Sequence, residues 1–367
     1  MTLILLVILI ALVFEYINGF HDTANSIATV VATKVLSPRQ AIILAAVSNL
    51  IGALIGTAVA KTIASGLVDP KVVTQEVLIC ALLGAITWNL ITWYWGLPSS
   101  SSHALVGGLV GASVAAANSW HVVIWSIPDT EHFYAGKGLL WKVVVPMFAS
   151  PLAGFTLGFL VMGLLYFLLR KWKPRWVNAV FGKAQLVSAA GMGLMHGTND
   201  AQKTMGIIAL ALAAGTASGQ LDDLPNWLSF LQIAAPEAGK SIDIPIWIKV
   251  VCAVVMAAGT AAGGWRIIKT LGHRMTKLQP VHGFAAETTS AFVIGIASHF
   301  GIPVSTTHNI SAAIMGVGSA KRFGALRWTV VEQMAWAWLL TIPISGFIGY
   351  FSIMLLKVVG FIPPNDN

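Results

Sequence analysis

Long apolar runs recur along the whole of this 367-residue chain, and they restrict its fold more than any other feature. A run of about 20 apolar residues is long enough to cross a bilayer as a helix. Only 10% of the residues are charged, against about 25% in a typical soluble domain, and the mean hydropathy is +0.79. These values predict an all-α polytopic membrane protein surrounded by the lipid bilayer.

The net charge of +8 does not indicate a nucleic-acid partner. The Lys and Arg residues gather in short segments between apolar runs, which is the positive-inside pattern of membrane proteins. The two cysteines, Cys80 and Cys252, both lie in apolar runs. We expect them to be small buried side chains, with no disulfide, no metal–thiolate site and no cofactor.

A short polar turn occurs twice in this apolar background. It reads GLPSSSSH at 96–103 and GIPVSTTH at 301–308. Both copies have Gly, an aliphatic residue, Pro, a variable residue, three hydroxyl residues and His. A second duplicated element precedes each turn and carries one Asp: GFHDTAN at 19–25 and GTNDAQK at 197–203. The chain therefore reads as two related halves.

Each half is predicted to contain the same series of segments. The first is a crossing interrupted by the Asp-bearing element, near Asn18-Gly19 and around Gly197 to Asp200. A second crossing follows, then a helical hairpin whose tip is the polar turn, then a long crossing. The resulting division is 1–169 as the first repeat, 170–183 as a short basic cytoplasmic linker, and 184–367 as the second repeat. A basic loop is expected at 266–277.

The distribution of basic residues predicts the orientation. If both termini are extracytoplasmic and each hairpin returns to its own side, about twice as many Lys and Arg residues face the cytoplasm as face outward. The two halves then begin on opposite sides of the cytoplasmic membrane. Inverted-topology repeats of this kind, with broken helices and re-entrant hairpins, are typical of secondary transporters with a site near the bilayer midplane.

Asp22 and Asp200 occupy equivalent positions inside apolar segments. A charged side chain at a helix centre costs roughly 2.5–3.5 kcal/mol. We interpret the pair as cation ligands, helped by unwound backbone carbonyls next to Gly19 and Gly197. Hard oxygen ligands suit sodium, and a carboxylate can also carry a proton. The alternative is a structural Asp that caps a half-helix.

The hydroxyl residues of the two turns follow a proline. Proline favours the first turn of a helix, where backbone N–H groups are free, and a helix N-terminus attracts anions. Two such ends meeting at the midplane would hold one compact oxyanion from both sides. The alternative is that the hydroxyls cap ordinary helices or bond to a carbonyl one turn back.

Other polar residues leave more than one interpretation open. Lys203 could pair with an acid, attract the anion, or extend its amine toward the interface. His103 and His308 close the two turns as structural or functional groups. Glu287 and Asn89 precede the two hairpin turns, and each could belong to the site or to the structure. Glu15 and Glu332 lie near helix ends and are expected at the membrane interface.

These motifs, together with Trp88-Asn89-Leu90, closely resemble the inorganic phosphate transporter (Pit) family, in particular its bacterial branch. The resemblance covers nearly the whole chain. It implies phosphate uptake coupled to sodium or protons, an inverted-repeat fold and a homodimer. It also places the paired aspartates of the family on Asp22 and Asp200, and its glutamate on Glu287. Many relatives have Ala-Asn where this chain has Phe20-His21, and many have a large loop between the halves.

The candidate site residues fall into three groups. The expected phosphate ligands are Thr23, Asn25, Ser101, Ser102, Gln202, Lys203, Ser305, Thr306 and Thr307. The expected sodium ligands are Asp22, Asp200, Asn199, His21, Ser99 and Ser100. The candidates for coupling or gating are Glu287, Asn89, His103 and His308.

The predicted function is secondary active import of phosphate with cations, sodium first. Moving one charge across 100 mV costs about 2.3 kcal/mol, so a phosphate dianion enters uphill unless at least two cations accompany it. Two aspartate sites could hold two sodium ions. The alternatives are symport of phosphate or a metal–phosphate complex with protons, a sulfate transporter, a passive channel, and an intramembrane hydrolase with a Ser/His pair.

Overall fold

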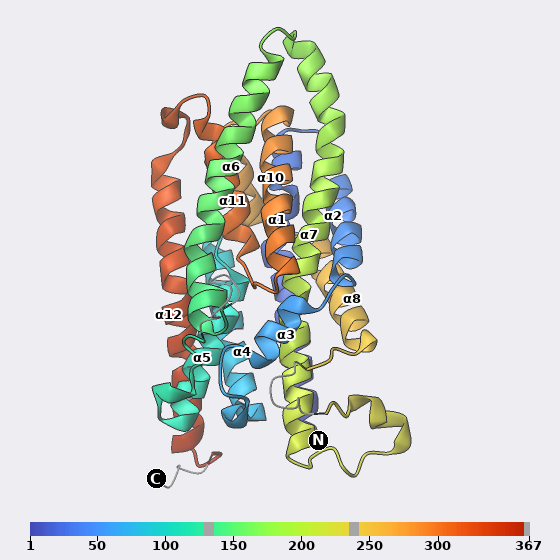
Figure 1. The fold of residues 1–367 in the computed structure, drawn as a ribbon, viewed down its shortest axis with the longest axis vertical. Coiled ribbons are helices and arrows are strands. Elements are labelled where there is room, and N and C mark those ends of the chain that lie inside the picture. The colour runs from blue at the N-terminus through green and yellow to red at the C-terminus, as the bar shows by residue number, and fades with distance from the viewer. Residues whose placement is uncertain (128–135, 235–241, 363–367) are drawn as a thin grey trace.

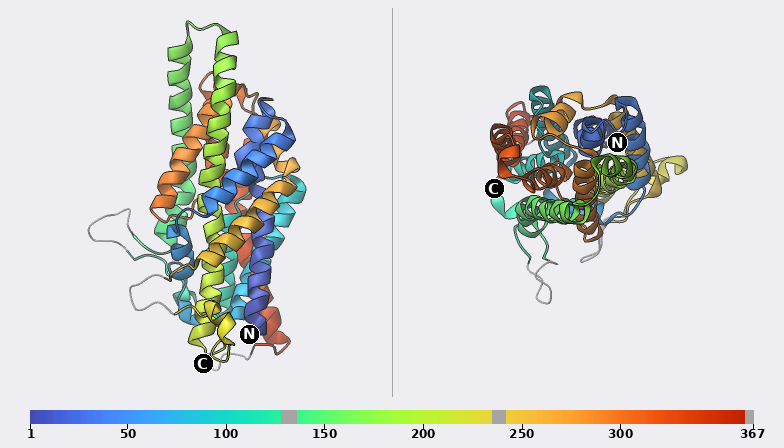
Figure 2. Two further views of the ribbon diagram at one scale, coloured as in Figure 1. Left: turned by 90° about the vertical axis from the view of Figure 1, so that its right-hand side faces the viewer. Right: turned by 90° about the horizontal axis from the view of Figure 1, so that it is seen from above.

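The computed structural model describes residues 1–127, 136–234 and 242–362, and its regular secondary structure in these ranges is helical apart from two isolated β-bridges. Most of the long helices run roughly along one axis, while α2, α3 and α8 are oblique to it (Figure 1). Seen from above, they form a single bundle (Figure 2). The all-α prediction is therefore confirmed.

The two halves contain the same order of helices. The first half has α1 (Thr2–Ala32), α2 (Pro38–Ala53), α3 (Ala58–Ser65), α4 (Gln75–Trp95), α5 (Ser101–Ala117) and α6 (Val145–Leu169). The second half has α7 (Pro174–Ala217), α8 (Ile246–Ala262), α9 (Trp265–Lys269), α10 (Pro280–His299), α11 (Thr306–Ser319) and α12 (Trp328–Val358). A π-helical segment, Leu140–Val144, leads into α6, and another, Thr270–Arg274, continues α9.

Several helices are long and apolar enough to cross a membrane. Among the described residues these are α1, α4, the segment Leu140–Leu169 and α12. Two bent pairs also qualify when each is taken as one span: α2 with α3, bent by 70°, and α8 with the segment Trp265–Arg274, bent by 59°. α7 is longer still, but its middle turns contain Asn199, Asp200 and Lys203, which lower its hydropathy. The chain is a multi-span membrane protein.

Both predicted helical hairpins are present, and local sequence explains their turns. Gly96 follows α4 and Gly301 follows α10, with φ of 67° and 63°, a left-handed conformation that glycine adopts without strain. Ser100 and Ser305 then begin α5 and α11, because each side chain accepts a hydrogen bond from the backbone N–H three residues on, at 3.2 and 3.1 Å. The α4–α5 hairpin lies toward the end of the bundle that carries the chain termini, and the α10–α11 hairpin lies toward the end with the α6–α7 turn (Figure 1).

The predicted breaks in the Asp-bearing helices are wrong. α1 and α7 are continuous through Gly19 and Gly197. These glycines instead permit close packing of helices: a Cβ atom on Gly19 would lie 2.5 Å from the carbonyl oxygen of Met256, and one on Gly197 would lie 2.3 Å from that of Asn49. The breaks fall in the second crossing of each half, between α2 and α3 and between α8 and α9.

Two predicted loops are largely helical. α7 begins at Pro174, so that only a few residues after α6 form the turn within the linker 170–183. The expected basic loop at 266–277 is helical from Trp265 to Arg274. α6 and α7 project beyond the other helices at this turn, while the N-terminus and the end of α12 lie at the opposite end (Figure 1).

The halves exchange packing partners. α5 packs against α12 of the other half, and α11 packs against α6 in the same way. Likewise, α2 packs against α7 and α8 against α1. Small residues permit these close contacts, as in other membrane bundles: Gly111 of α5 faces the backbone of Gly346, and Gly158 of α6 faces that of Ala313. This exchange brings residues of both halves together in the middle of the bundle.

Candidate functional site

The N-termini of α5 and α11 meet at the centre of the molecule. The rings of His103 and His308, which are equivalent in the two repeats, make an edge-to-face contact with centroids 4.8 Å apart. Ser102 Oγ donates a hydrogen bond to the carbonyl oxygen of Val304 in the other turn, at 3.4 Å. The first backbone N–H groups of a helix have no partner within it, so two sets of N–H donors converge here.

α1 brings Asp22 to this point. Its Oδ1 atom accepts hydrogen bonds from His21 Nδ1, at 2.7 Å, and from the hydroxyl of Thr307 in α11, at 3.2 Å. One turn further on, the amide of Asn25 donates to the hydroxyls of Thr307, at 2.9 Å, and Thr306, at 3.2 Å. The far side of the His21 ring is hydrogen-bonded to Thr92 at 3.2 Å.

α7 brings Asp200 from the other side. Its Oδ1 atom accepts a short hydrogen bond from Lys203, and its Oδ2 atom accepts one from the hydroxyl of Thr306 at 2.8 Å. His196 lies one turn earlier on α7, with Nε2 3.0 Å from Oδ2 of Asp200. Lys203 also donates to the hydroxyl of Ser102 and, at 3.3 Å, to the carbonyl oxygen of Val304.

The two aspartates converge on one place. Ligand atoms of Asp22, Asp200 and His196 lie within 4.8 Å of one another, and all three residues are buried. Carboxylate, imidazole and hydroxyl groups at this spacing can hold a small cation. The central cluster, as we call it, consists of the side chains that meet at this point. Its members are His21, Asp22, Asn25, Ser101, Ser102, His196, Asp200, Lys203, Thr306 and Thr307.

Some buried polar atoms around this point have no hydrogen-bond partner among the described residues. They include the side-chain oxygens of Asn25, Asn199 and Ser101, and both amide atoms of Asn89. Buried polar groups in proteins are almost always paired. Asn25 and Ser101 belong to the central cluster, so their unpaired oxygens are available to a polar ligand there.

Not every predicted ligand points into the central cluster. Thr23 donates its hydroxyl to carbonyl oxygens of Gly19 and Thr260, at 2.6 and 3.3 Å, on the side of α1 that faces α8. Gln202 accepts hydrogen bonds from the N–H groups of Val59 and Ala60, at 2.8 and 3.2 Å, and thereby caps α3 after the bend. Thr23 and Gln202 therefore hold neighbouring helices together and do not point into the central cluster.

Three of the predicted sodium ligands also form hydrogen bonds that hold the turns. Asn199 donates to the hydroxyl of Ser298 at 2.8 Å and to the carbonyl of Ile302 at 3.3 Å. Ser100 caps α5, as Ser305 caps α11. Ser99 is hydrogen-bonded to Thr92 at 2.8 Å and so supports His21 from behind.

Glu287 lies in a second buried polar cluster. Its Oε1 atom accepts hydrogen bonds from Thr29, at 2.5 Å, and Gln185, at 3.0 Å, and its Oε2 atom accepts one from Ser188 at 2.5 Å. Thr29 lies two turns along α1 from Asp22, on the same face, so this cluster is about 10 Å further along the helix axis. Glu287 therefore connects α10 to both Asp-bearing helices.

Sequence reasoning missed two buried groups. His196 precedes Asp200 by four residues, a spacing that places both on one helix face and that could have identified it. Glu15 was expected at the membrane interface because it lies near a predicted helix end. It is instead fully buried and accepts a short hydrogen bond from Thr204 on α7. Its spacing of seven residues from Asp22 continues the same polar face of α1.

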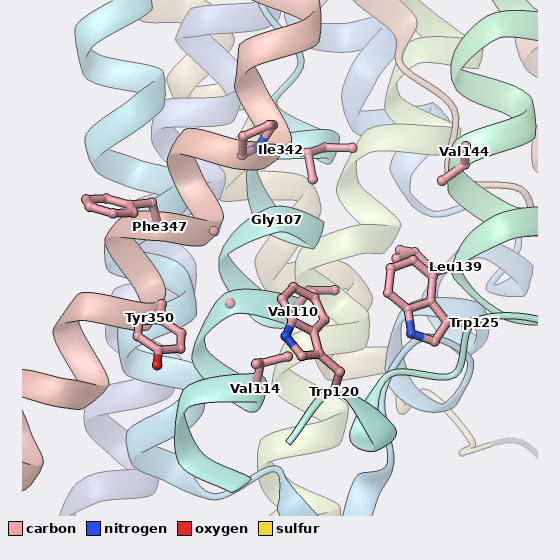
Figure 3. Close-up of a pocket in the computed structure, with 13 residues that line it drawn as sticks. Gly107, Val110, Val114, Trp120, Trp125, Leu139, Val144, Ile342, Phe347 and Tyr350 are labelled. Carbon is pink, nitrogen blue, oxygen red and sulfur yellow. The ribbon is translucent and has the colours of Figure 1, made fainter. Parts of the chain in front are cut away.

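The pocket in Figure 3 lies elsewhere. It has a volume of about 450 Å³ and is formed by α5, α12 and the residues before α6. Its lining is apolar and aromatic, including Val110, Trp120, Trp125 and Phe347. It contains none of the charged groups described above, so we do not assign it to the candidate site.

The fold and the central cluster define a class of protein: a multi-span membrane transporter with a polar site buried in the middle of its helices. The phosphate transporter family matches residues 18–349. The chain belongs to this family, which consists of transporters and not enzymes.

Curated relatives resemble the chain over nearly its whole length. A probable low-affinity inorganic phosphate transporter of Mycobacterium bovis is 43% identical over 361 residues, covering 98% of this chain and 79% of the relative. One of Bacillus subtilis is 41% identical over 359 residues, covering 97% and 98%. A solved structure, the sodium-dependent phosphate transporter, has the same fold, with a TM-score of 0.78, 21% identity, and coverage of 98% of this chain and 100% of that one.

Proposed function

We propose that this chain imports inorganic phosphate through the central cluster by symport with a monovalent cation, sodium being our first choice. The observation that carries the proposal is the meeting of two hydroxyl-rich helix N-termini at a pair of buried aspartates. The first feature suits a compact oxyanion and the second suits a cation. The relatives named as inorganic phosphate transporters support the choice of anion.

The anion would be bound by the first turns of α5 and α11. Each turn offers free backbone N–H groups. The hydroxyls of Ser102, Thr306 and Thr307 donate to Val304, Asp200 and Asp22, so they would donate to the anion only after their O–H groups rotate away from these acceptors. The hydroxyl of Ser101 has no partner among the described residues. Such donors match the oxygens of phosphate without adding another full charge.

The cation would bind between the carboxylates and the anion. Asp22 and Asp200 would otherwise repel a phosphate at this distance in a medium of low dielectric constant. A sodium ion held by Asp22 would remove that repulsion, so that each ligand binds more tightly when the other is present. The solved structure with the same fold is named as sodium-dependent, which supports this choice of ion.

The proposed transport cycle uses the symmetry of the chain. We infer inverted repeats in the cytoplasmic membrane, with re-entrant hairpins α4–α5 and α10–α11, both termini extracytoplasmic, and rocking of the repeats around the central cluster. The exchange of packing partners between halves supports this scheme. The homodimer implied by the resemblance remains a proposal, which light scattering on the purified protein would test.

Protons are the second candidate for the coupling ion. A histidine lies against each aspartate: His21 at 2.7 Å from Asp22 and His196 at 3.0 Å from Asp200. An imidazole beside a carboxylate can accept and release a proton. Proton-coupled transport, of phosphate or of a metal–phosphate complex, would use these same residues.

The test is uptake of labelled phosphate into proteoliposomes that contain the purified protein, under an inward sodium gradient or an inward proton gradient. We expect accumulation driven by sodium and inhibition by unlabelled phosphate but not by sulfate. Accumulation with the proton gradient alone would assign the coupling to protons. A chain that accumulates phosphate under neither gradient would not be a symporter of this anion.

A further inference from the structure

Lys203 is a buried basic residue at the centre of the membrane bundle, with 2% of its side chain exposed. Its ammonium group donates to three oxygens: a carboxylate oxygen of Asp200, the hydroxyl of Ser102 and the backbone carbonyl of Val304. An ammonium has three N–H donors, so these contacts use all of them. None is left to bind a phosphate oxygen.

The oxygens around Lys203 are the kinds that coordinate a hard metal cation. Carboxylate, hydroxyl and backbone carbonyl oxygens are the usual ligands of such ions, and an ammonium is itself a compact point charge. We propose that the Lys203 ammonium is a tethered cation that permanently fills the cation position at Asp200. This inference rests on the proposed function, and it assigns Lys203 to the cation side of the site and not to phosphate.

The equivalent position in the first repeat supports this assignment. Asn25 aligns with Lys203, and its neutral amide donates to Thr306 and Thr307, whereas Lys203 donates to the aspartate of its own repeat. Both hydrogen bonds that Asp22 accepts from the described residues fall on its Oδ1 atom. No lysine or arginine forms an ion pair with Asp22 in the described part of the chain. The exchangeable cation therefore binds at Asp22.

This asymmetry changes the charge that moves with phosphate. With Asp200 neutralised by a residue of the protein, one mobile monovalent cation balances the remaining carboxylate. Each cycle then carries one cation, and transport of dihydrogen phosphate is electroneutral. Two mobile cations, one for each aspartate, would instead balance the phosphate dianion.

The experiment counts cations in wild type and in Lys203→Asn, which introduces the residue of the other repeat. Binding of sodium-22 to purified protein in the presence of inorganic phosphate gives the number of ions per chain. Uptake in proteoliposomes gives the dependence of rate on sodium. We expect one bound ion in wild type, a second one in Lys203→Asn with steeper sodium dependence, and one in Lys203→Arg, which keeps the charge.

Several outcomes would overturn the inference. Two bound ions in wild type would contradict it directly, whatever the variants do. So would a Lys203→Asn protein that binds one ion and differs only by weaker phosphate binding, because that result assigns Lys203 to the anion. If Lys203→Asn fails to fold, the inference is tested by the number of ions bound to Lys203→Gln and to wild type. If protons are the coupling ion, a pH-sensitive dye counts the protons taken up with each phosphate. One proton per phosphate in wild type would support the inference, and two would overturn it.

The proposed function can fail separately. Wild-type protein that transports phosphate with two cations would overturn only the tethered-cation inference. Wild-type protein that binds one cation but accumulates no phosphate under either gradient would overturn the proposed symport and leave the cation count of the site in place.

Discussion

At the scale of single residues, Thr307 links the two sides of the proposed site. Its hydroxyl donates to Asp22 and accepts a hydrogen bond from Asn25. We expect Thr307→Val to weaken sodium-dependent phosphate uptake by about tenfold or more, because a hydrogen bond to a charged group contributes roughly 1.5–3 kcal/mol. Thr307→Ser keeps the hydroxyl and should retain most of the activity. Equal uptake by Thr307→Val and wild type would remove Thr307 from the site.

Glu287 gives a prediction about stability. Thr29, Gln185 and Ser188 all donate to its buried carboxyl group. Glu287→Ala leaves these donors unpaired, at roughly 1–3 kcal/mol for each group, so the purified protein should melt at a clearly lower temperature. Glu332, which is exposed on α12, supplies the matched control, and Glu332→Ala should melt like wild type. A similar melting temperature for both variants would contradict this account of Glu287.

The sequence could predict which types of side chain gather at the centre, but not all of their directions. Repetition identified Asp22, Asp200 and the turn hydroxyls, and these converge. Thr23 and Gln202 lie in the same motifs but project from other faces of their helices, because successive residues of a helix are about 100° apart. Glu15 was misjudged because its burial depends on a contact with a helix of the other half.

At the scale of elements, the glycines of the Asp-bearing helices are packing points. Gly197→Ala would place a Cβ atom 2.3 Å from the backbone oxygen of Asn49, so α2 and α7 would have to separate. We expect loss of folded protein and of uptake. Gly191→Ala on the same helix meets nothing within 4 Å and should be neutral or slightly stabilising, by about 0.5–1 kcal/mol. Comparable melting of the two variants would contradict the packing role.

The hairpins were predicted from sequence, while the positions of the helix breaks were not. Gly and Pro in the repeated turns, followed by a capping serine, act locally and leave a readable pattern. The breaks after α2 and α8 contain Gly56 and Gly263, with φ of 76° and 75°, a local signal that the sequence analysis did not use. Contacts with residues far along the chain also hold these breaks. Gln202 of α7 caps the start of α3, for example, and no local pattern near Ala58 indicates that contact.

At the scale of the whole molecule, the repeats predict where each loop lies. Native Cys80 and Cys252 are buried, so an added exposed cysteine can be labelled selectively. A cysteine at Lys71 should react with an impermeant thiol reagent added outside intact cells. One at Lys173, between α6 and α7, should react only after the membrane is opened. Labelling of both positions from outside would contradict the inverted orientation.

The part of the architecture that could be predicted from sequence is the part that occurs in both halves. Two copies of the same motifs predicted two copies of the same order of helices, and both are present. The exchange of partners, in which α5 packs on α12 and α11 on α6, arises from long-range packing that a linear pattern does not encode.

The central claim is that phosphate and its cation bind together at Asp22 and the two helix N-termini. The most direct measurement is equilibrium binding of labelled phosphate to the purified protein at increasing sodium concentration, for wild type, Asp22→Asn and Asp69→Asn. Asp69 caps a short helix in a loop through the N–H of Lys71, which asparagine can also do. We predict sodium-dependent binding in wild type and Asp69→Asn and its loss in folded Asp22→Asn. Phosphate binding by Asp22→Asn with the sodium dependence of wild type would contradict the account.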